Sequence, residues 1–252
     1  MNFLNSICSY AINSTISSNT FVNLIGITFY NSAYYTVDWS SGNVVMFDKN
    51  WTYIKSSIYI SPYLYNIKAV DGYLYVTTYQ NGIYKIDLNL NIIGNYLDNY
   101  FEGMYYNSTS NTIFVASYYS SKIVELTPDL VFVSSMAAIG YPSSLNGFNN
   151  TLYVGTLEGN IVIYVDRIFS YMSNGCSNVR SSSALTILFD DYGNMGVQCE
   201  YLYEHYFLGF YLNGSYTGYS MNMSFNITAA QIFFDSSGSL LLVGTQQIIL
   251  LS

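Results

Sequence analysis

Residues that could carry out chemistry are few in this chain of 252 residues, whose only histidine is His205. A single histidine excludes any metal site that needs two imidazole ligands, and it leaves one candidate for a Ser-His-Asp or Cys-His pair. His205 stands among tyrosines, where an imidazole at the surface is the ordinary interpretation. The Gly-rich phosphate-binding motifs and the Gly-x-Ser-x-Gly nucleophile motif are absent. The sequence therefore identifies no catalytic residue and predicts no cofactor.

Charged residues make up only 9% of the chain, against about 25% in ordinary soluble domains. Fifteen acidic and seven basic residues give a net charge of -8, so a phosphate backbone would be repelled and nucleic-acid binding is not expected. Asn, Ser and Gly interrupt every apolar segment, which excludes a transmembrane helix. The first eight residues lack the basic segment of a secretory signal, which leaves either a cytosolic chain or a processed fragment.

A repeat organises the chain. Short β-like segments carry valines at positions 37, 76, 115 and 154, which are 39 residues apart three times in succession. Weaker matches follow at Val197 and Val243. A period between about 20 and 50 residues is typical of solenoids and propellers. Six such units account for the chain.

Each unit has the same internal pattern. An apolar strand is followed by a turn rich in Asp, Asn, Ser and Gly, such as Asp71-Gly72, and then by a second strand that carries the valine. A third strand alternates with period two, as in residues 44–47, and a variable fourth strand leads into the next unit. Four antiparallel strands in about 40 residues are typical of a propeller blade. The predicted fold is therefore all-β, a six-bladed β-propeller.

The six units divide a single β-propeller domain, residues 1-252, into blades over residues 23-62, 63-99, 100-140, 141-181, 182-226 and 227-252. The last unit ends with a third strand at residues 247–251 and leaves no residues for a fourth. Residues 1-22 are therefore predicted to supply a closing strand and a linker, since otherwise a sheet edge would stay unpaired. The fifth unit is longer, and its extra residues are expected in the hairpin after the second strand.

These units resemble the repeat of the NHL-type six-bladed propellers. The first unit is similar to that repeat at Gly26-Ile27 and at residues 35–38 and 43–48, and the fifth unit is similar at residues 187–194. The basic residue that the family has in its third strand is missing here, which weakens the inference to partners bound through basic faces. Some propellers of this kind are calcium-dependent lactonases, with the metal held in the central channel near the starts of the innermost strands.

The resemblance implies a polar channel mouth suited to ligands rich in hydroxyl groups. The predicted ligand-binding residues at the equivalent positions are Tyr65, Asn66, Glu102, Ser143, Ser144 and Gln231. Glu102 is the one carboxylate among them, whereas a calcium site gathers about six to eight oxygens, so no metal site is predicted. The alternative is a channel filled by water and small side chains.

Three cysteines, Cys8, Cys176 and Cys199, allow one disulfide and one remaining thiol. Cys176 precedes the first strand of the fifth blade and Cys199 ends its second strand, so a disulfide between these two is predicted. Cys8 lies in the closing strand of another blade. Three buried thiols are the alternative.

Seven Asn-x-Ser/Thr sequons are predicted glycosylation sites, although chance alone gives about five at this composition. The sequons are at Asn13, Asn50, Asn107, Asn149, Asn213, Asn222 and Asn226. Four of them, at positions 50, 107, 149 and 213, fall in predicted hairpin turns, where a glycan would project into water.

The chain also contains 29 tyrosines, whose rings are expected to pack between blades while their hydroxyls reach the rim. The lone histidine, the lone channel carboxylate and the weakly charged surface favour a non-catalytic scaffold. This scaffold would be secreted or at the cell surface, and it would bind glycans, proteins or copies of itself. One alternative is a calcium-dependent lactonase or related hydrolase, and the other is an intracellular adaptor for protein interactions.

Overall fold

The computed structural model of the chain describes residues 12–17, 23–173, 176, 184–189, 195–201, 205–212, 215–223, 229–234, 240–244 and 247–251. Side chains are described over residues 23–172, 186–189 and 195–197 and at Cys176 and Cys199. In these residues, no helix is long and apolar enough to span a bilayer.

The described residues form strands in six four-stranded antiparallel sheets. The first three sheets consist of β2 (Leu24–Tyr30), β3 (Ala33–Asp38), β4 (Asn43–Asp48) and β5 (Tyr53–Ser56); β6 (Leu64–Val70), β7 (Tyr73–Thr78), β8 (Gly82–Asp87) and β9 (Ile92–Tyr96); and β10 (Phe101–Asn107), β11 (Thr112–Ser117), β12 (Lys122–Leu126) and β13 (Phe132–Ala137). The other three consist of β14 (Pro142–Phe148), β15 (Thr151–Thr156), β16 (Ile161–Val165) and β17 (Ile168–Ser173); β18 (Ala184–Phe189), β19 (Met195–Tyr201), β20 (His205–Leu212) and β21 (Ser215–Met223); and β22 (Ala229–Phe234), β23 (Leu240–Gly244), β24 (Gln247–Leu251) and β1 (Ile12–Ser17). The predicted all-β class and four-stranded repeat are confirmed.

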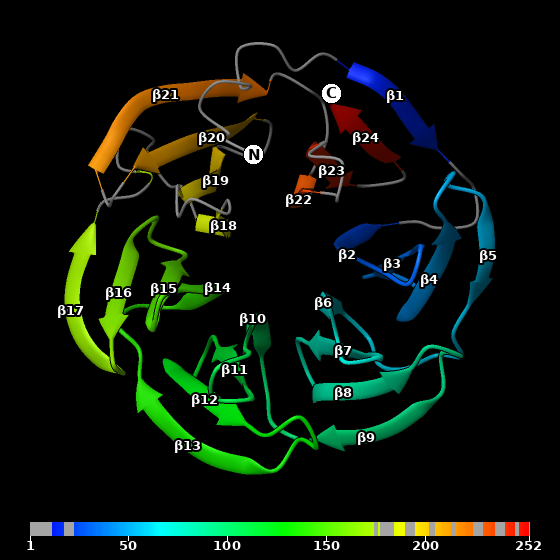
Figure 1. Cartoon of the computed structure of the whole chain (residues 1–252), viewed down its shortest axis with the longest axis horizontal. Helices are drawn as coiled ribbons and strands as arrows, with labels where there is room; N and C mark the ends of the chain where they lie inside the picture. The colour runs from blue at the N-terminus through cyan, green and yellow to red at the C-terminus, as the bar shows by residue number, and fades with distance from the viewer. Residues whose placement is uncertain are drawn as a thin grey trace.

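The sheets stand side by side around a common axis, with the first strand of each nearest the axis and the fourth outermost (Figure 1). The first strands β2, β6, β10, β14 and β18 contact one another in succession. At Gly103 two of them approach so closely that a Cβ atom would lie 2.5 Å from the Cα atom of Ser144. Glycine is therefore required at position 103.

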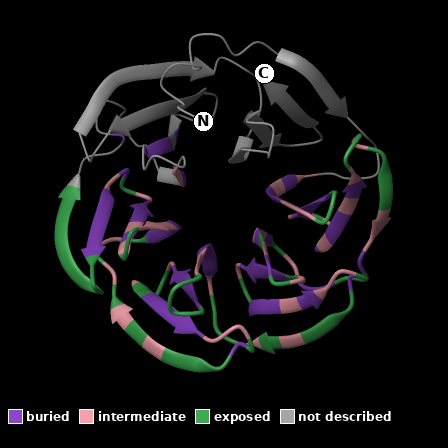
Figure 2. Cartoon of the chain, viewed as in Figure 1, coloured by how far each residue is buried: buried purple, intermediate pink, exposed green. Residues whose placement is uncertain are grey.

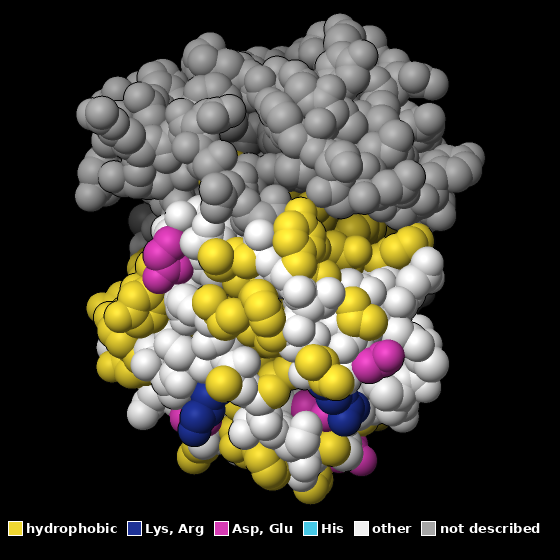
Figure 3. Space-filling view, turned by 90° about the vertical axis from the view of Figure 1, so that its left-hand side faces the viewer, with side chains coloured by type: hydrophobic (Ala, Val, Ile, Leu, Met, Phe, Trp, Pro, Cys, Tyr) yellow, Lys and Arg dark blue, Asp and Glu magenta, His cyan; other side chains and the backbone are white. Residues whose placement is uncertain are grey.

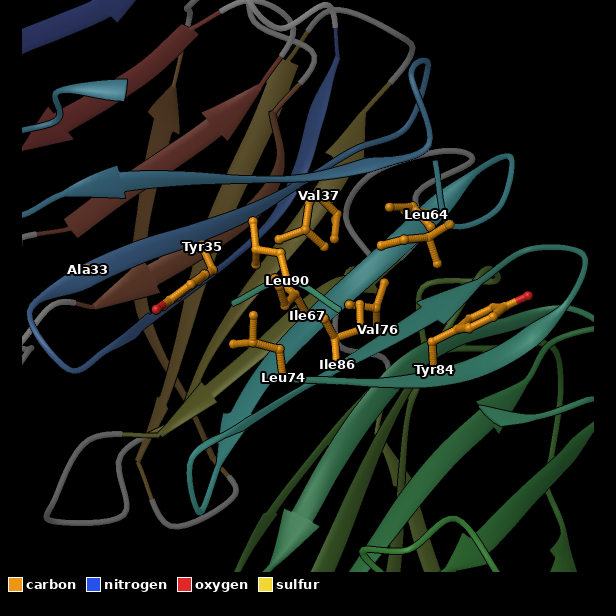
Figure 4. Packing of buried hydrophobic residues seen from close by; sticks show 12 residues of the cluster. Ala33, Tyr35, Val37, Leu64, Ile67, Leu74, Val76, Tyr84, Ile86 and Leu90 are labelled. Carbon is orange, nitrogen blue, oxygen red and sulfur yellow. The ribbon is translucent and has the colours of Figure 1, made fainter. Parts of the chain in front are cut away.

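Apolar side chains fill the spaces between neighbouring sheets. One cluster joins the sheet β2–β5 to the sheet β6–β9 and includes the buried residues Val37, Leu64, Ile67, Val76 and Ile86 (Figure 4). Similar clusters join the next pairs of sheets. Burying one such side chain contributes about 1.5–3 kcal/mol, so these contacts hold each sheet against the next. In the described sheets buried residues concentrate on the inner strands and exposed residues on the outermost ones (Figure 2).

The valine repeat is regular in four sheets and shifted in the first and the sixth, where Val37 and Val243 pair with the third residue of β2 and of β22. Val76 pairs with Ile67, and the valines at 115, 154 and 197 occupy the equivalent position. Val37 instead pairs with Gly26, and the first-sheet residue equivalent to Val76 is Thr36. Val37 therefore keeps the 39-residue spacing but not the register of the valines in those four sheets. Every residue of β3 is buried, so a valine packs well on either face of the strand and the pattern does not fix the register.

The outermost strands β9, β13 and β17 expose large apolar side chains. Examples are Ile93, Phe132 and Ile168, the last of which is 73% exposed. In side view, hydrophobic and uncharged polar atoms cover most of the described surface, with a few charged groups between them (Figure 3). This surface is the structural counterpart of a sequence with only 9% charged residues.

The strand β1 lies beside β24, although the two are far apart in the sequence (Figure 1). They pair antiparallel, with Ile12 opposite Leu251 and Ser17 opposite Gln247. Consequently β1 takes the fourth place in the sheet of β22, β23 and β24.

The extra residues of the fifth unit lengthen its strands. Tyr201 at the end of β19 pairs with His205 at the start of β20, and β20 and β21 have 8 and 9 residues. The additional length is thus shared between two hairpins. His205 begins a third strand, away from the strands nearest the axis.

Cys176 and Cys199 form the predicted disulfide, with their Cα atoms 5.9 Å apart. Both belong to the apolar cluster between the fourth and fifth sheets. The bond ties the segment that follows β17 to the strand β19. Cys8 lies outside the described residues.

The glycosylation sequons lie in several settings. Asn50 and Asn149 are in exposed turns. Asn107 is instead the last residue of β10, and the turn begins after it. Its Oδ1 atom accepts hydrogen bonds from the backbone N–H groups of Thr109 and Ser110 in that turn. Of the other sequon positions, 13 and 222 lie in β1 and β21, and 213 and 226 lie outside the described residues.

Candidate functional site

Aromatic side chains gather at the end of the ring of sheets where the second strands finish and the first strands begin. Trp39, Tyr79 and Tyr118 directly follow β3, β7 and β11. Tyrosines also directly precede β6, β10 and β14. The set called the aromatic face below consists of Trp39, Tyr63, Tyr65, Tyr79, Tyr100, Tyr118, Tyr119 and Tyr141.

Backbone hydrogen bonds fix these aromatic positions. The N–H of Tyr79 donates to the carbonyl of Tyr63 at 3.0 Å, and the N–H of Tyr118 donates to the carbonyl of Tyr100 at 2.9 Å. Each bond joins the residue after a second strand to the residue before the first strand of the same sheet. The repeat therefore places two aromatic residues of each of these sheets side by side at one end of the ring.

The rings also contact one another from sheet to sheet. The ring centroids of Trp39 and Tyr63 are 4.9 Å apart, and those of Trp39 and Tyr79 are 6.1 Å apart. Tyr79 then meets Tyr100 of the next sheet edge-on at 4.9 Å. Aromatic pairs in such geometries contribute about 0.5–1.5 kcal/mol beyond their burial, so the rings hold one another in place.

Tyr119 continues the row toward the fourth sheet. Its ring lies edge-on to Tyr100 at 4.2 Å and to Tyr118 at 4.5 Å, and Tyr118 contacts Tyr141 at 5.3 Å. Tyr119 is 55% exposed and Tyr141 is 46% exposed. The face therefore combines fixed rings with a large area open to solvent.

Two hydroxyls of this face, those of Tyr79 and Tyr118, have a raised pKa and are neutral at pH 7. The hydroxyl of Tyr79 donates a hydrogen bond to that of Tyr119 at 3.0 Å, and this bond together with burial raises the pKa of Tyr79. Burial and the nearby Glu102 carboxyl raise the pKa of Tyr118. The surface offers neutral hydrogen-bonding groups beside apolar rings.

Glu102, the second residue of β10, lies beneath these tyrosines and is only 4% exposed. Tyr65 donates a hydrogen bond to its carboxyl group, while the Oε2 atom has no partner among the described residues. Burial raises the pKa of Glu102 to about 8, and the hydrogen bond from Tyr65 offsets only part of this effect. At pH 7 the group is therefore mostly a neutral carboxylic acid.

The residues predicted for the channel mouth separate into two levels. Tyr65 and Glu102 contact each other next to the aromatic face. Asn66 and Ser144 line a cavity that lies among the first strands.

The two remaining predicted residues take other positions. The hydroxyl of Ser143 is buried and donates to the carbonyl of Gly155 at 3.2 Å, so it bridges two strands of its own sheet. Gln231 lies in β22, and its side chain is outside the described part. Among the described residues, no cluster of three or more His, Cys, Asp and Glu side chains could hold a metal ion.

Most of the aromatic face was missed by the sequence analysis, which assigned the tyrosines to strands in general. A signal was present in the spacing. Aromatic residues occupy positions 39, 79 and 118, close to the period of the repeat, and each directly follows a second strand. The contacts between sheets are not visible in this pattern because they join residues of different units.

Comparison with known proteins shows likeness in structure alone. No protein-family model matches the sequence, and no curated protein matches it. A structure of streptogramin B lyase superposes with a TM-score of 0.73 at 11% identity, and the match covers 96% of this chain and 97% of the lyase. A structure of a catalytically inactive virginiamycin B lyase from Staphylococcus aureus, with quinupristin, gives 0.73 at 13% identity over 97% and 99% of the two chains.

These matches concern the fold. Virginiamycin B lyase is a six-bladed β-propeller of NHL-like type. The match over nearly the whole length supports a propeller arrangement for the repeated four-stranded sheets of this chain.

Proposed function

We propose that this chain is a non-catalytic binding scaffold and that the aromatic face is its ligand-binding surface. The supporting observation is the row of contacting rings from Trp39 to Tyr141. Tyrosine provides a large contact area at low cost in conformational entropy, and its hydroxyl supplies hydrogen bonds. Glycans present both apolar faces and hydroxyl groups, so they are the ligand class that fits best. Protein partners and copies of the chain itself are the other candidates.

Glu102 supports a neutral ligand. Its pKa of about 8 keeps the carboxyl protonated at pH 7, so no negative charge lies beside the aromatic face. A calcium ion would instead require more oxygens and more than one carboxylate. The site thus favours a neutral ligand over a metal ion.

An enzyme is the second candidate, because a buried carboxyl with a raised pKa is also what a general acid–base needs. The similarity to the two lyases gives this enzyme alternative little support. One of them is inactive as a variant in which a histidine is replaced by alanine. The histidine of this chain, His205, begins the third strand of its sheet rather than a first strand like that of Glu102.

We also propose that β1 completes a sixth blade and closes the ring. The supporting observation is its pairing with β24 from Ile12 to Ser17. Without β1, the strand β24 would present an unpaired edge. The closure would join the two ends of the chain without a covalent bond.

An extracellular or cell-surface location is part of the same proposal. A disulfide between Cys176 and Cys199 is typical of an oxidising compartment. Asn50 and Asn149 lie in exposed turns that could carry glycans. An intact mass equal to that of the bare chain, after expression in a secretory host, would favour the intracellular adaptor instead.

The proposal can be tested by screening the protein on a glycan array and measuring the affinity for the best glycan in solution. Tyr119→Ala removes the most exposed ring of the aromatic face, and it should weaken binding at least tenfold. Tyr171→Ala is the matched control, because Tyr171 is 45% exposed on the outer strand β17. The affinity of Tyr171→Ala for the glycan should equal that of the wild type.

Equal loss in both variants would contradict the aromatic face as the binding surface. The enzyme alternative is tested with lactone, ester and phosphoester substrates in the presence of calcium or zinc. Turnover that Glu102→Gln abolishes would overturn the scaffold proposal. Concentration-dependent self-association that Tyr119→Ala prevents would assign the face to copies of the chain rather than to glycans.

A further inference from the structure

We propose that the cavity among the first strands is a binding site for a small oxyanion, centred on Lys68. The cavity has a volume of about 70 Å³ and is bordered by β2, β6, β10, β14 and β18. Its polar lining includes Thr28, Asn66, Lys68, Tyr105, Asn146 and Thr186. This site goes beyond the proposed function, because it does not involve the aromatic face.

The cavity is separate from the Glu102 carboxyl. Glu102 is the second residue of β10, whereas Lys68 is the fifth residue of β6. The two positions differ by three residues along neighbouring first strands, which corresponds to about 10 Å along the strand direction. Glu102 is not part of the cavity lining, and neither group affects the pKa of the other. The two titratable side chains therefore lie at different levels along the axis.

Several hydrogen-bond donors of the lining have no acceptor. Lys68 forms no hydrogen bond or ion pair with any residue that the structure describes. The Thr186 hydroxyl is buried and also lacks a partner in this part of the chain. The side chains of Asn66 and Tyr105 make no hydrogen bond with the described residues either. Donors left without protein acceptors in one cavity usually pair with water or a ligand.

Among the described residues, nothing compensates the charge of the cavity. Desolvation lowers the pKa of Lys68, and no carboxylate in the described part of the chain contributes to this change. The other titratable group of the described lining is Tyr105, whose pKa burial raises. The lining residues from β2, β14 and β18 are neutral. Lys68 is nevertheless accessible to water, so a small solute can reach its amine.

An oxyanion matches this arrangement better than any neutral ligand. It supplies the missing charge to Lys68 and several acceptor lone pairs to the hydroxyl and amide donors. The side chain of Asn146 already has hydrogen-bond partners within the protein. Its amide group donates to the carbonyl of Ile187 at 2.8 Å, and its Oδ1 atom accepts from the N–H of Gly147 at 2.8 Å. The volume of about 70 Å³ is sufficient for one carboxylate or phosphate group.

The test is calorimetric titration of the full chain with inorganic phosphate and with acetate at constant ionic strength. Saturable binding is expected, and Lys68→Met should weaken it at least tenfold. Lys49→Met is the matched control, because it removes one charge from an exposed turn and should leave binding unchanged. Tyr105→Phe keeps the ring against Gly147 and should weaken binding several-fold. A higher affinity for phosphate than for acetate would indicate a phosphorylated ligand, and the reverse would indicate a carboxylic acid. Either result supports the site.

A second measurement does not depend on the folding of a variant. Reductive methylation of the wild-type protein, mapped by mass spectrometry, should modify Lys68 more slowly when phosphate or acetate is present, while Lys49 reacts at an unchanged rate. Absence of saturable binding in the wild type would overturn the proposal. Equal affinity in Lys68→Met, or equal modification of Lys68 with and without the anion, would overturn it as well.

Discussion

Glu102→Gln should make the stability of this protein less dependent on pH. Burial raises the pKa of Glu102 from its ordinary value of 4.5 to about 8. The folded state therefore holds this proton more tightly than the unfolded chain does. It follows that the contribution of Glu102 to the free energy of unfolding is largest below pH 4.5 and falls as the pH rises from 4.5 to about 8.

The size of this effect follows from the two pKa values. The interval from 4.5 to about 8, at about 1.4 kcal/mol per pH unit, amounts to about 5 kcal/mol. Most of this loss is complete at pH 7. Glutamine stays neutral over the whole range and can still accept the hydrogen bond from Tyr65. The free energy of unfolding of Glu102→Gln, relative to the wild type, should therefore increase by about 4 kcal/mol between pH 4.5 and pH 8, because each end of this interval coincides with one pKa and the titration is half complete there.

The assay is urea denaturation of both proteins at several pH values across this interval. Taking the difference between the two proteins removes contributions of other groups, such as Asp87, whose pKa is lowered by a hydrogen bond from the backbone of Asn91. Glu158→Gln is the matched control, because Glu158 is exposed and its difference from the wild type should stay small. A constant difference between Glu102→Gln and the wild type from pH 4.5 to pH 8 would refute the reasoning.

Two further predictions concern the packing and closure of the ring. Gly103→Ala should destabilise the fold by about 1–3 kcal/mol, because the new methyl group would meet the backbone of β14, whereas Gly94→Ala, with its nearest atom 3.9 Å away, should be tolerated in the same urea assay. Deleting residues 1–20 should lower the Tm by about 10 °C, since it removes β1 and exposes the edge of β24. An unchanged Tm would show that β1 does not close the ring.

The repeated architecture could be predicted because its signals are local. Turn residues such as Asp71-Gly72 recur with the strands, and alternation within the third strands has period two. The register of the first sheet could not be predicted in the same way. Thr36 and Val37 are both fully buried, so the hydrophobic pattern has no exposed face against which the strand can be aligned.

The site shows the same division between local and distant information. Glu102 could be placed near the axis from its position at the start of a first strand. Its protonation could not be predicted, because it depends on burial and on a hydrogen bond from Tyr65 of the neighbouring sheet. The aromatic face depends on contacts such as that between Tyr79 and Tyr100, which come from different units. Sequence spacing indicates which end of a strand a residue occupies, but not which side chains meet between sheets.

The two titratable groups near the axis, Glu102 and Lys68, do not contribute to each other's pKa shift. If Glu102 and Lys68 formed an ion pair, the pKa of the acid would be lowered and that of the amine raised. The opposite is found, since burial shifts each group toward its neutral form and neither responds to the other. In a chain with 9% charged residues, few other charges are available to compensate them. This separation agrees with the two proposals made above, a neutral ligand on the aromatic face beside Glu102 and an oxyanion at Lys68.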